Sequence, residues 1–186
     1  MTKELQILKN RLILLQCKQR KDEGFRTLIG LYERPLFYYL RRFTDREEDA
    51  WDALQEAWIK VLRSIPNVKS AETLTPWLYR VVRNTMIDHQ RRDRHWEPLP
   101  EDNEAGAIAD ETARQDSLDS ETAEEVHWGL AKLASAEREV LTLFYLEEFQ
   151  TQEIAEITGL PLGTIKSRLH RARVNLRAIL EKERQR

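Results

Sequence analysis

Hydrophobic residues recur every three or four positions along most of the chain, which is the spacing of amphipathic helices. In the first half this pattern predicts four helices, over about residues 4–19, 24–43, 44–65 and 76–94. In the second half it predicts four more, from about residue 124 and over 135–146, 151–157 and 162–183. No convincing two-residue alternation predicts a strand. The pattern therefore favours an all-α fold.

Local signals place several helix ends. Thr44 to Glu47 has the spacing of a capping box, so the third helix is expected to start there. Thr75 followed by Pro76 supplies an N-cap and a first-turn proline for the fourth helix. The first helix is predicted from a stripe of leucines, at positions 5, 8, 12 and 15.

Residues 96–123 have the composition of a flexible linker, with prolines, a glycine, many acids and few large apolar residues. The chain has a total net charge of −2, distributed unevenly as +6, −10 and +2 over residues 1–96, 97–129 and 130–186. This pattern is expected when two modules bind a polyanion and the acidic segment between them is repelled by it. We predict two small helical domains, 1–95 and 124–186, joined by the acidic linker.

The C-terminal module has the pattern of a helix-turn-helix over residues 151–180, with Gly159 suited to the turn between helices. One stripe of the last helix is apolar, and residues 162–180 contain five bases and no acid. A helix that reads base edges needs polar and cationic side chains opposite its packed stripe. The candidate DNA contacts are Lys166, Ser167, Arg168, His170, Arg171 and Arg173. A solvated basic face is the alternative, and His170 alone is equally explained as a surface histidine.

The N-terminal module offers a second polar face, on the helix over 76–94. Its candidate contacts to DNA are Arg80, Asn84, Asp88, Arg91 and Arg92. An amide and a carboxylate among arginines suit base-edge hydrogen bonds beside phosphate contacts, but an ordinary solvated face has the same pattern. On the preceding helix, Trp51 and Trp58 are compatible with core packing or with a protein-docking surface.

Several other classes of protein are disfavoured. Mean hydropathy is −0.64 and no run of 18 apolar residues occurs, so we expect neither a membrane span nor a secretory signal. The single cysteine, Cys17, excludes an internal disulfide and is interpreted as buried filler rather than a redox sensor. The four histidines lack metal-ligand spacing, and no phosphate loop or nucleophile motif occurs. We expect a cytoplasmic protein that is no enzyme and has no cofactor; a conventional operator-binding regulator is the main alternative.

Three segments together resemble the extracytoplasmic-function (ECF) group of bacterial RNA polymerase sigma factors, in the sigma-70 family. They are DAWDALQEAWIKVLRSI (49–65), PWLYRVVRNTMIDHQRR (76–92) and PLGTIKSRLHRAR (161–173). The resemblance implies a subunit that binds core RNA polymerase and directs promoter recognition and opening. It also implies that the acidic linker threads the active-centre cleft and RNA exit path.

The resemblance assigns roles to particular residues. Core polymerase would be contacted through its flap region and through the clamp helices of its largest subunit, the latter by Asp52, Gln55, Glu56 and Trp58. The minus-ten element would be read by Asn84 and Asp88, with the 67–75 loop holding a flipped base. The minus-thirty-five element would be read by the last helix. A nucleoid-associated location and an anti-sigma factor as a further partner are also implied.

Overall fold

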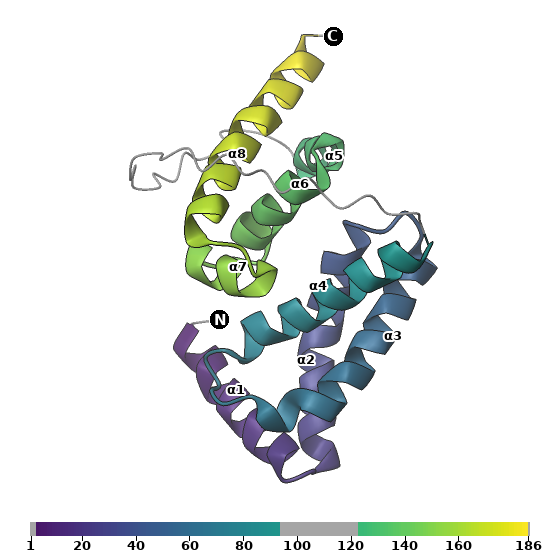
Figure 1. Cartoon of the computed structure of the whole chain (residues 1–186), viewed down its shortest axis with the longest axis vertical. Coiled ribbons are helices and arrows are strands. Elements are labelled where there is room, and N and C mark those ends of the chain that lie inside the picture. The colour runs from purple at the N-terminus through teal and green to yellow at the C-terminus, as the bar shows by residue number, and fades with distance from the viewer. Residues whose placement is uncertain (1–2, 94–122, 186) are drawn as a thin grey trace. The chain divides into compact units, whose positions relative to one another are not determined.

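In the computed structural model, residues 3–93 and 123–185 are described, and over these ranges the chain forms helices and no strand (Figure 1). The predicted all-α class is therefore confirmed. Two compact units are present, and each is described separately below. The predicted linker lies outside the described residues, except for Ala123. Within the described ranges, no helix is both long and apolar enough to cross a bilayer.

Unit 1 is the purple-to-teal part of Figure 1. Its elements are α1 (Lys3–Lys18), α2 (Asp22–Arg41), α3 (Glu47–Ser64), the 3₁₀ turn η1 (Ile65–Asn67) and α4 (Leu74–Asp93). Helix α2 packs against α1, α3 and α4, and α3 packs along α4. The interior is filled by large side chains with at most 1% exposure, including Leu28, Leu36, Tyr39, Leu54 and Leu78.

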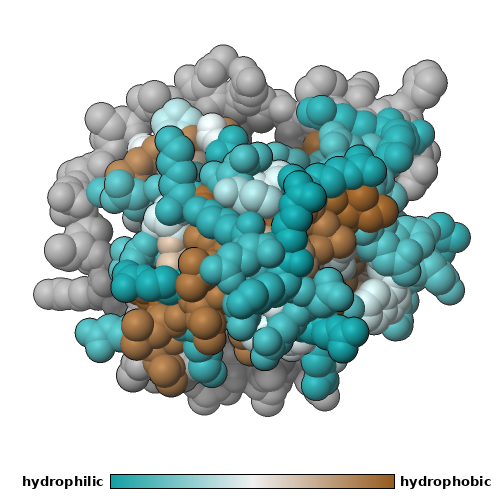
Figure 2. All heavy atoms as spheres, turned by 90° about the horizontal axis from the view of Figure 1, so that it is seen from below, coloured by the Kyte–Doolittle hydropathy of each residue, from teal (hydrophilic) through white to brown (hydrophobic). Residues whose placement is uncertain are grey.

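The leucine stripe of α1 faces solvent rather than the core. Leu8 and Leu12 are 59% and 58% exposed, and the other two leucines of the stripe are about half exposed. The core side of the same helix is made by Ile13, Leu14 and Cys17. Burial raises the pKa of the Cys17 thiol to about 11, which keeps it protonated and unreactive. This agrees with the interpretation of Cys17 as a residue that fills space in the core rather than a redox sensor. Figure 2 shows apolar side chains at the surface of the molecule as brown patches among teal polar ones.

Two predicted helix starts are wrong by two or three residues. The Thr44 hydroxyl donates to the Leu40 carbonyl at 3.3 Å, at the end of α2, so α3 begins at Glu47 after Arg46. Helix α4 begins at Leu74, and Thr75 lies inside its first turn. In both places a threonine side chain is engaged elsewhere and does not cap the helix that its spacing predicts.

Unit 2 is the green-to-yellow part of Figure 1. Its elements are α5 (Ala123–Lys132), α6 (Ser135–Leu141), the π-helical turn η2 (Thr142–Leu146), α7 (Thr151–Thr158) and α8 (Leu162–Arg184). The helix predicted over 135–146 is thus divided into α6 and η2. Helix α8 packs against α5 and α6. Arg138 of α6 donates to the carbonyls of Leu130 and Ala131 at 2.9 and 2.8 Å, which satisfies acceptors at the end of α5.

Candidate nucleic-acid interface

The helix-turn-helix of unit 2 is closed by local hydrogen bonds. At the start of α7 the backbone N–H of Gln150 donates to the Glu153 carboxylate at 2.8 Å, as part of a capping box. At its end Gly159 has φ 75°, a left-handed conformation that favours glycine, and its N–H donates to the Ala155 carbonyl at 2.8 Å. The turn that the sequence predicts is therefore present between α7 and α8.

Helix α8 separates an apolar side from a polar side. Its predicted stripe is buried in unit 2 and consists of Ile165, Leu169, Ala172, Leu176 and Leu180. Of the candidate base readers, Lys166, His170 and Arg171 are exposed. Ser167 is half-buried, and its hydroxyl donates to the Thr164 carbonyl at 3.1 Å. These four side chains lie outside the buried apolar stripe of α8.

Two further candidates lie differently from what was expected. Arg168 is only 8% exposed, and its buried Nε has no hydrogen-bond partner in the part of the chain that the structure describes. The Arg173 guanidinium lies over the rings of Phe144 and Tyr145, at 5.4 and 5.6 Å from their centroids. Both positions border the packed stripe, so their long side chains pack against unit 2 itself. Their role as DNA contacts stays a prediction.

One functional neighbour of α8 was missed by the sequence reasoning. Glu137, in the first turn of α6, is 7% exposed. Its Oε1 accepts hydrogen bonds from Arg171 Nε at 3.2 Å and from Asn175 Nδ2 at 2.9 Å. The residues are 34 and 38 positions apart in sequence, so no periodicity within one helix could have indicated the contact.

In unit 1 the predicted polar face of α4 is exposed. Arg80, Asn84, Asp88 and Arg91 are exposed, as is Arg92 beside them. The opposite side of the helix is buried in the core through Leu78, Val82 and Met86. An amide and a carboxylate are thus held among arginines on one accessible helix face.

This face is linked to α3 through Glu56. One oxygen of its carboxylate accepts from Lys60 Nζ at 2.9 Å, and the other contacts His89 Nε2 at 2.7 Å and Arg92 Nη2 at 2.6 Å. Lys60 also lies 3.4 Å from the Asp88 carboxylate. Hydrogen bonds from Arg92, Lys60 and His89 lower the pKa of Glu56 to about 2. The structure therefore joins a candidate polymerase contact, Glu56, to two candidate DNA contacts in one ionic network.

The other candidate docking residues divide between surface and core. Asp52 and Gln55 are exposed on α3. Trp58 is 9% exposed and belongs to the core, and its buried Nε1 has no hydrogen-bond partner among the described residues. Trp51 is the more accessible indole, 37% exposed, and it stacks on Phe37 at 4.2 Å between ring centroids. The sequence was compatible with core packing or with protein docking for the two tryptophans, and the structure shows core packing for Trp58.

The loop before α4 is held by α1, a role that the sequence did not reveal. Asn10 is 2% exposed, and its Nδ2 donates to the Thr75 hydroxyl at 3.1 Å and to the Ala71 carbonyl at 3.4 Å. The Tyr32 hydroxyl donates to Asn10 Oδ1 at 2.7 Å and lies 2.8 Å from the Thr75 hydroxyl. A buried polar network of this kind fixes the geometry of the loop that enters α4.

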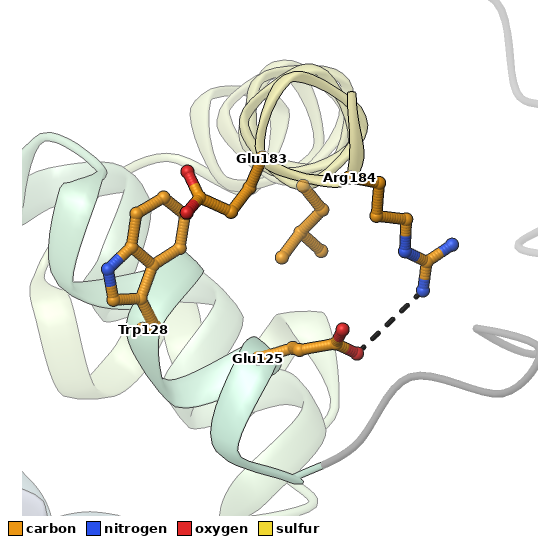
Figure 3. A pocket seen from close by; sticks show the side chains of 5 residues that line it. Glu125, Trp128, Glu183 and Arg184 are labelled. Atoms are coloured by element: carbon orange, nitrogen blue, oxygen red, sulfur yellow. Dashed lines mark ion pairs between the residues drawn. The ribbon is translucent and has the colours of Figure 1, made fainter. Parts of the chain in front are cut away.

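Unit 2 also contains a hollow of about 310 Å³ between α5 and α8 (Figure 3). Trp128 and Leu180 supply its apolar part, and Glu125, Glu183 and Arg184 supply its charged border. Glu125 and Arg184 form an ion pair at 3.8 Å, drawn as the dashed line in Figure 3. No group of metal-ligating side chains occurs within residues 3–93 and 123–185.

A helical unit with an exposed amide, carboxylate and arginines, and a second unit with a cationic helix-turn-helix, together define a two-part DNA-binding protein. Comparison with known proteins shows the family to which the chain belongs. The family models described as Sigma-70 region 2 and Sigma-70, region 4 match residues 28–96 and 124–176. The chain belongs to the ECF group of RNA polymerase sigma factors.

Three similar proteins illustrate the relationship. RNA polymerase sigma factor SigV of Bacillus subtilis is 30% identical over 169 residues, covering 91% of this chain and 98% of SigV. The ECF sigma factor SigW of the same organism is 28% identical over 172 residues, covering 87% and 91%. The sigma factor RpoE of Bartonella quintana, solved with the anti-sigma factor NepR, has a TM-score of 0.65 at 23% identity, covering 86% and 98%. This last likeness concerns the fold.

Proposed function

We propose that the two units of this sigma factor contact separate promoter elements while the chain is bound to core RNA polymerase. As a member of its family, the chain functions in promoter-directed initiation of transcription. The observation that carries the division of roles is the outward face of α8, which contains cations and no acid from residue 162 to 180. We assign residues 1–95 and 124–186 to the two promoter-contacting domains.

Unit 2 is proposed to read the minus-thirty-five element. Lys166, Ser167, His170 and Arg171 supply donors and acceptors at the accessible face of a helix that follows a helix-turn-helix turn. Arg168 and Arg173, which pack against unit 2, are proposed to add positive charge behind this face rather than to read bases. Long-range attraction of phosphates does not require that a cation touch them.

Unit 1 is proposed to read and help open the minus-ten element. Opening costs about 1–2 kcal/mol per base-pair step, so unpaired bases must be bound better than paired ones. Asn84 and Asp88 supply hydrogen-bonding groups for exposed base edges, and Arg80, Arg91 and Arg92 supply charge for the phosphates. The loop over 67–75, fixed by Asn10 and Tyr32, is the proposed holder of a flipped base.

Core polymerase is proposed to dock on α3. Asp52 and Gln55 are accessible there beside Glu56, and Trp58 supports the helix from inside the core. The partner surface is the clamp helices of the polymerase's largest subunit. The hollow beside Trp128 offers an apolar floor for a side chain from the polymerase flap region (Figure 3).

The remaining assignments concern the whole chain. The acidic linker over 96–123 is proposed to thread the active-centre cleft and RNA exit path. Because the similar Bartonella quintana protein is bound by an anti-sigma factor, we propose such a factor as a partner here too. The protein is proposed to work in the cytoplasm, on the nucleoid, without a cofactor and without catalytic activity of its own.

Run-off transcription tests these roles, using the full chain, bacterial core polymerase and a promoter library. The wild-type chain should confer start-site selection. Asp52→Lys should weaken association with core, because it reverses a charge on the docking surface, and should leave the preferred promoter unchanged. Asn84→Ala should leave association with core unchanged and reduce opening, detected by reactivity of unpaired thymines. A chain that protects duplex DNA without any polymerase-dependent opening would instead behave as an operator-binding regulator.

A further inference from the structure

The contact between α6 and α8 concerns how the base-reading side chain is held. Arg171 is a long side chain with many rotamers, and an arginine that reads a base must present its guanidinium in one plane. An exposed arginine loses this conformational freedom only when it binds DNA. A contact that fixes the guanidinium beforehand lowers the entropy loss on binding.

Glu137 makes such a contact. Its Oε1 accepts from Arg171 Nε at 3.2 Å, and the same oxygen accepts from Asn175 Nδ2 at 2.9 Å. Arg171 and Asn175 are one helical turn apart, so a single carboxylate oxygen accepts hydrogen bonds from two side chains on the same side of α8. The guanidinium donates to Glu137 through its Nε–H group, and the Arg171 side chain stays 46% exposed.

The burial of Glu137 makes this contact more than an incidental surface pair. The side chain is only 9% exposed, whereas the ion pairs Arg11–Glu72 and Arg177–Glu181 join side chains that are each more than half exposed. Removing a carboxylate from water is costly unless it is paired and hydrogen-bonded. Both of these donors, Arg171 and Asn175, come from α8, so the Glu137 carboxylate of α6 and the recognition helix hold each other in place.

We propose that Glu137 is a positioning residue for promoter recognition, which holds Arg171 in the orientation that reads one base pair of the upstream element. The proposal rests on the function proposed above for Arg171. Glu137 itself does not touch DNA in this proposal. It acts on sequence preference through Arg171, and the loss of its charge should matter only at the base pair that Arg171 reads.

The test uses the full chain in holoenzyme with bacterial core polymerase. The probe is a duplex selected by the wild-type holoenzyme from a library randomised over the upstream element, and then changed one base pair at a time. Competition binding gives the preference for each base over its alternatives. Arg171→Ala should abolish the preference at one base pair, which identifies the position that Arg171 reads.

Glu137→Gln should lower the preference at that same base pair by about three- to tenfold and leave the other positions unchanged. The double variant with Arg171→Ala should behave as Arg171→Ala alone, because Glu137 then has no arginine to position. Glu181→Gln is the matched control. It removes the same charge from a partner of another α8 arginine, Arg177, 3.6 Å away, and should leave every preference unchanged.

Three outcomes would overturn the proposal. One is an equal loss of binding on all sequences with Glu137→Gln, which would make the residue a purely structural one. Another is a loss of preference that persists in the Arg171→Ala background. If Arg171→Ala itself changes no preference, the assignment of Arg171 as a base reader fails, and the positioning role fails with it.

Thermal unfolding of each variant shows whether unit 2 remains folded. Asn175→Ala, which removes the other partner of Glu137, shows how much the contact between α6 and α8 contributes to the stability of unit 2.

Discussion

At the scale of single residues, two glutamates each hold an arginine that the proposed function assigns to DNA. Glu137 holds Arg171 in unit 2, and Glu56 holds Arg92, Lys60 and His89 in unit 1. The two differ in burial, since the Glu56 side chain is 32% exposed and that of Glu137 is 9% exposed. Partial exposure makes Glu56 a group whose titration can be followed in the folded chain.

Replacing Glu56 by glutamine should destabilise the chain by about 1 kcal/mol at pH 7, the upper range for exposed ion pairs, because three partners lose one carboxylate. Its folded pKa of about 2 lies below its ordinary value of 4.5. A depressed pKa contributes stability that is full above the unfolded value and is lost as pH falls through the folded one. The difference between wild type and variant should therefore shrink between about pH 5 and pH 2.

Urea unfolding at a series of pH values measures this difference. Glu48→Gln is the control, because it removes the charge of an exposed glutamate in the first turn of the same helix. It should show a much smaller and less pH-dependent change. A constant difference from pH 7 to pH 3 for Glu56→Gln would contradict the ionic network as the source of the stability.

At the scale of elements, α8 and α1 show how far a hydrophobic pattern leads. In α8 five apolar residues form one stripe that the structure buries, namely Ile165, Leu169, Ala172, Leu176 and Leu180, whereas Val174 lies off the stripe and is 55% exposed. In α1 the apolar residues occur all round the helix, as the leucine stripe and as Ile13, Leu14 and Cys17. A pattern with two apolar sides predicts a helix but does not decide which side is packed.

In the candidate site, the sequence likewise predicts positions along one helix but not the contacts between helices. Positions along one helix, such as Arg80, Asn84 and Asp88, were predictable because they follow from 3.6 residues per turn. Contacts between helices, such as Glu137 with Arg171 or Asn10 with Thr75, depend on packing between segments more than 30 residues apart. Helix starts also failed where a threonine was engaged by another element, because propensity yields to tertiary hydrogen bonds.

Neighbouring positions on α1 test which of its sides is packed. Leu12→Ala should change the free energy of unfolding by no more than about 0.5 kcal/mol, because that side chain is 58% exposed. Ile13→Ala should cost about 2–4 kcal/mol, because it leaves a cavity where the side chain is 1% exposed. Chemical denaturation of both variants measures the contrast. Equal losses at both positions would mean that the leucine stripe is covered in the full chain.

At the scale of the whole molecule, the distribution of charge matters more than its total. The net charge of −2 combines two basic stretches with an acidic one between them. Residues 101–121 contain eight acids and one base, Arg114. An anionic segment tethered to cationic faces competes with DNA for them at high effective concentration. We therefore expect the linker to weaken promoter binding by the free chain, before polymerase engages it.

Deleting residues 101–121 should raise the affinity of the polymerase-free chain for promoter duplex several-fold at low salt, and the gain should fall as salt screens the competing charges. Fluorescence anisotropy over a range of salt concentrations measures both. A chain of full length in which the eight acids of this segment are replaced by their amides separates charge from length, and it should reproduce the gain. Unchanged affinity in both variants would show that the segment does not compete with DNA. A gain with the deletion alone would assign the effect to the length of the connector rather than to its charge.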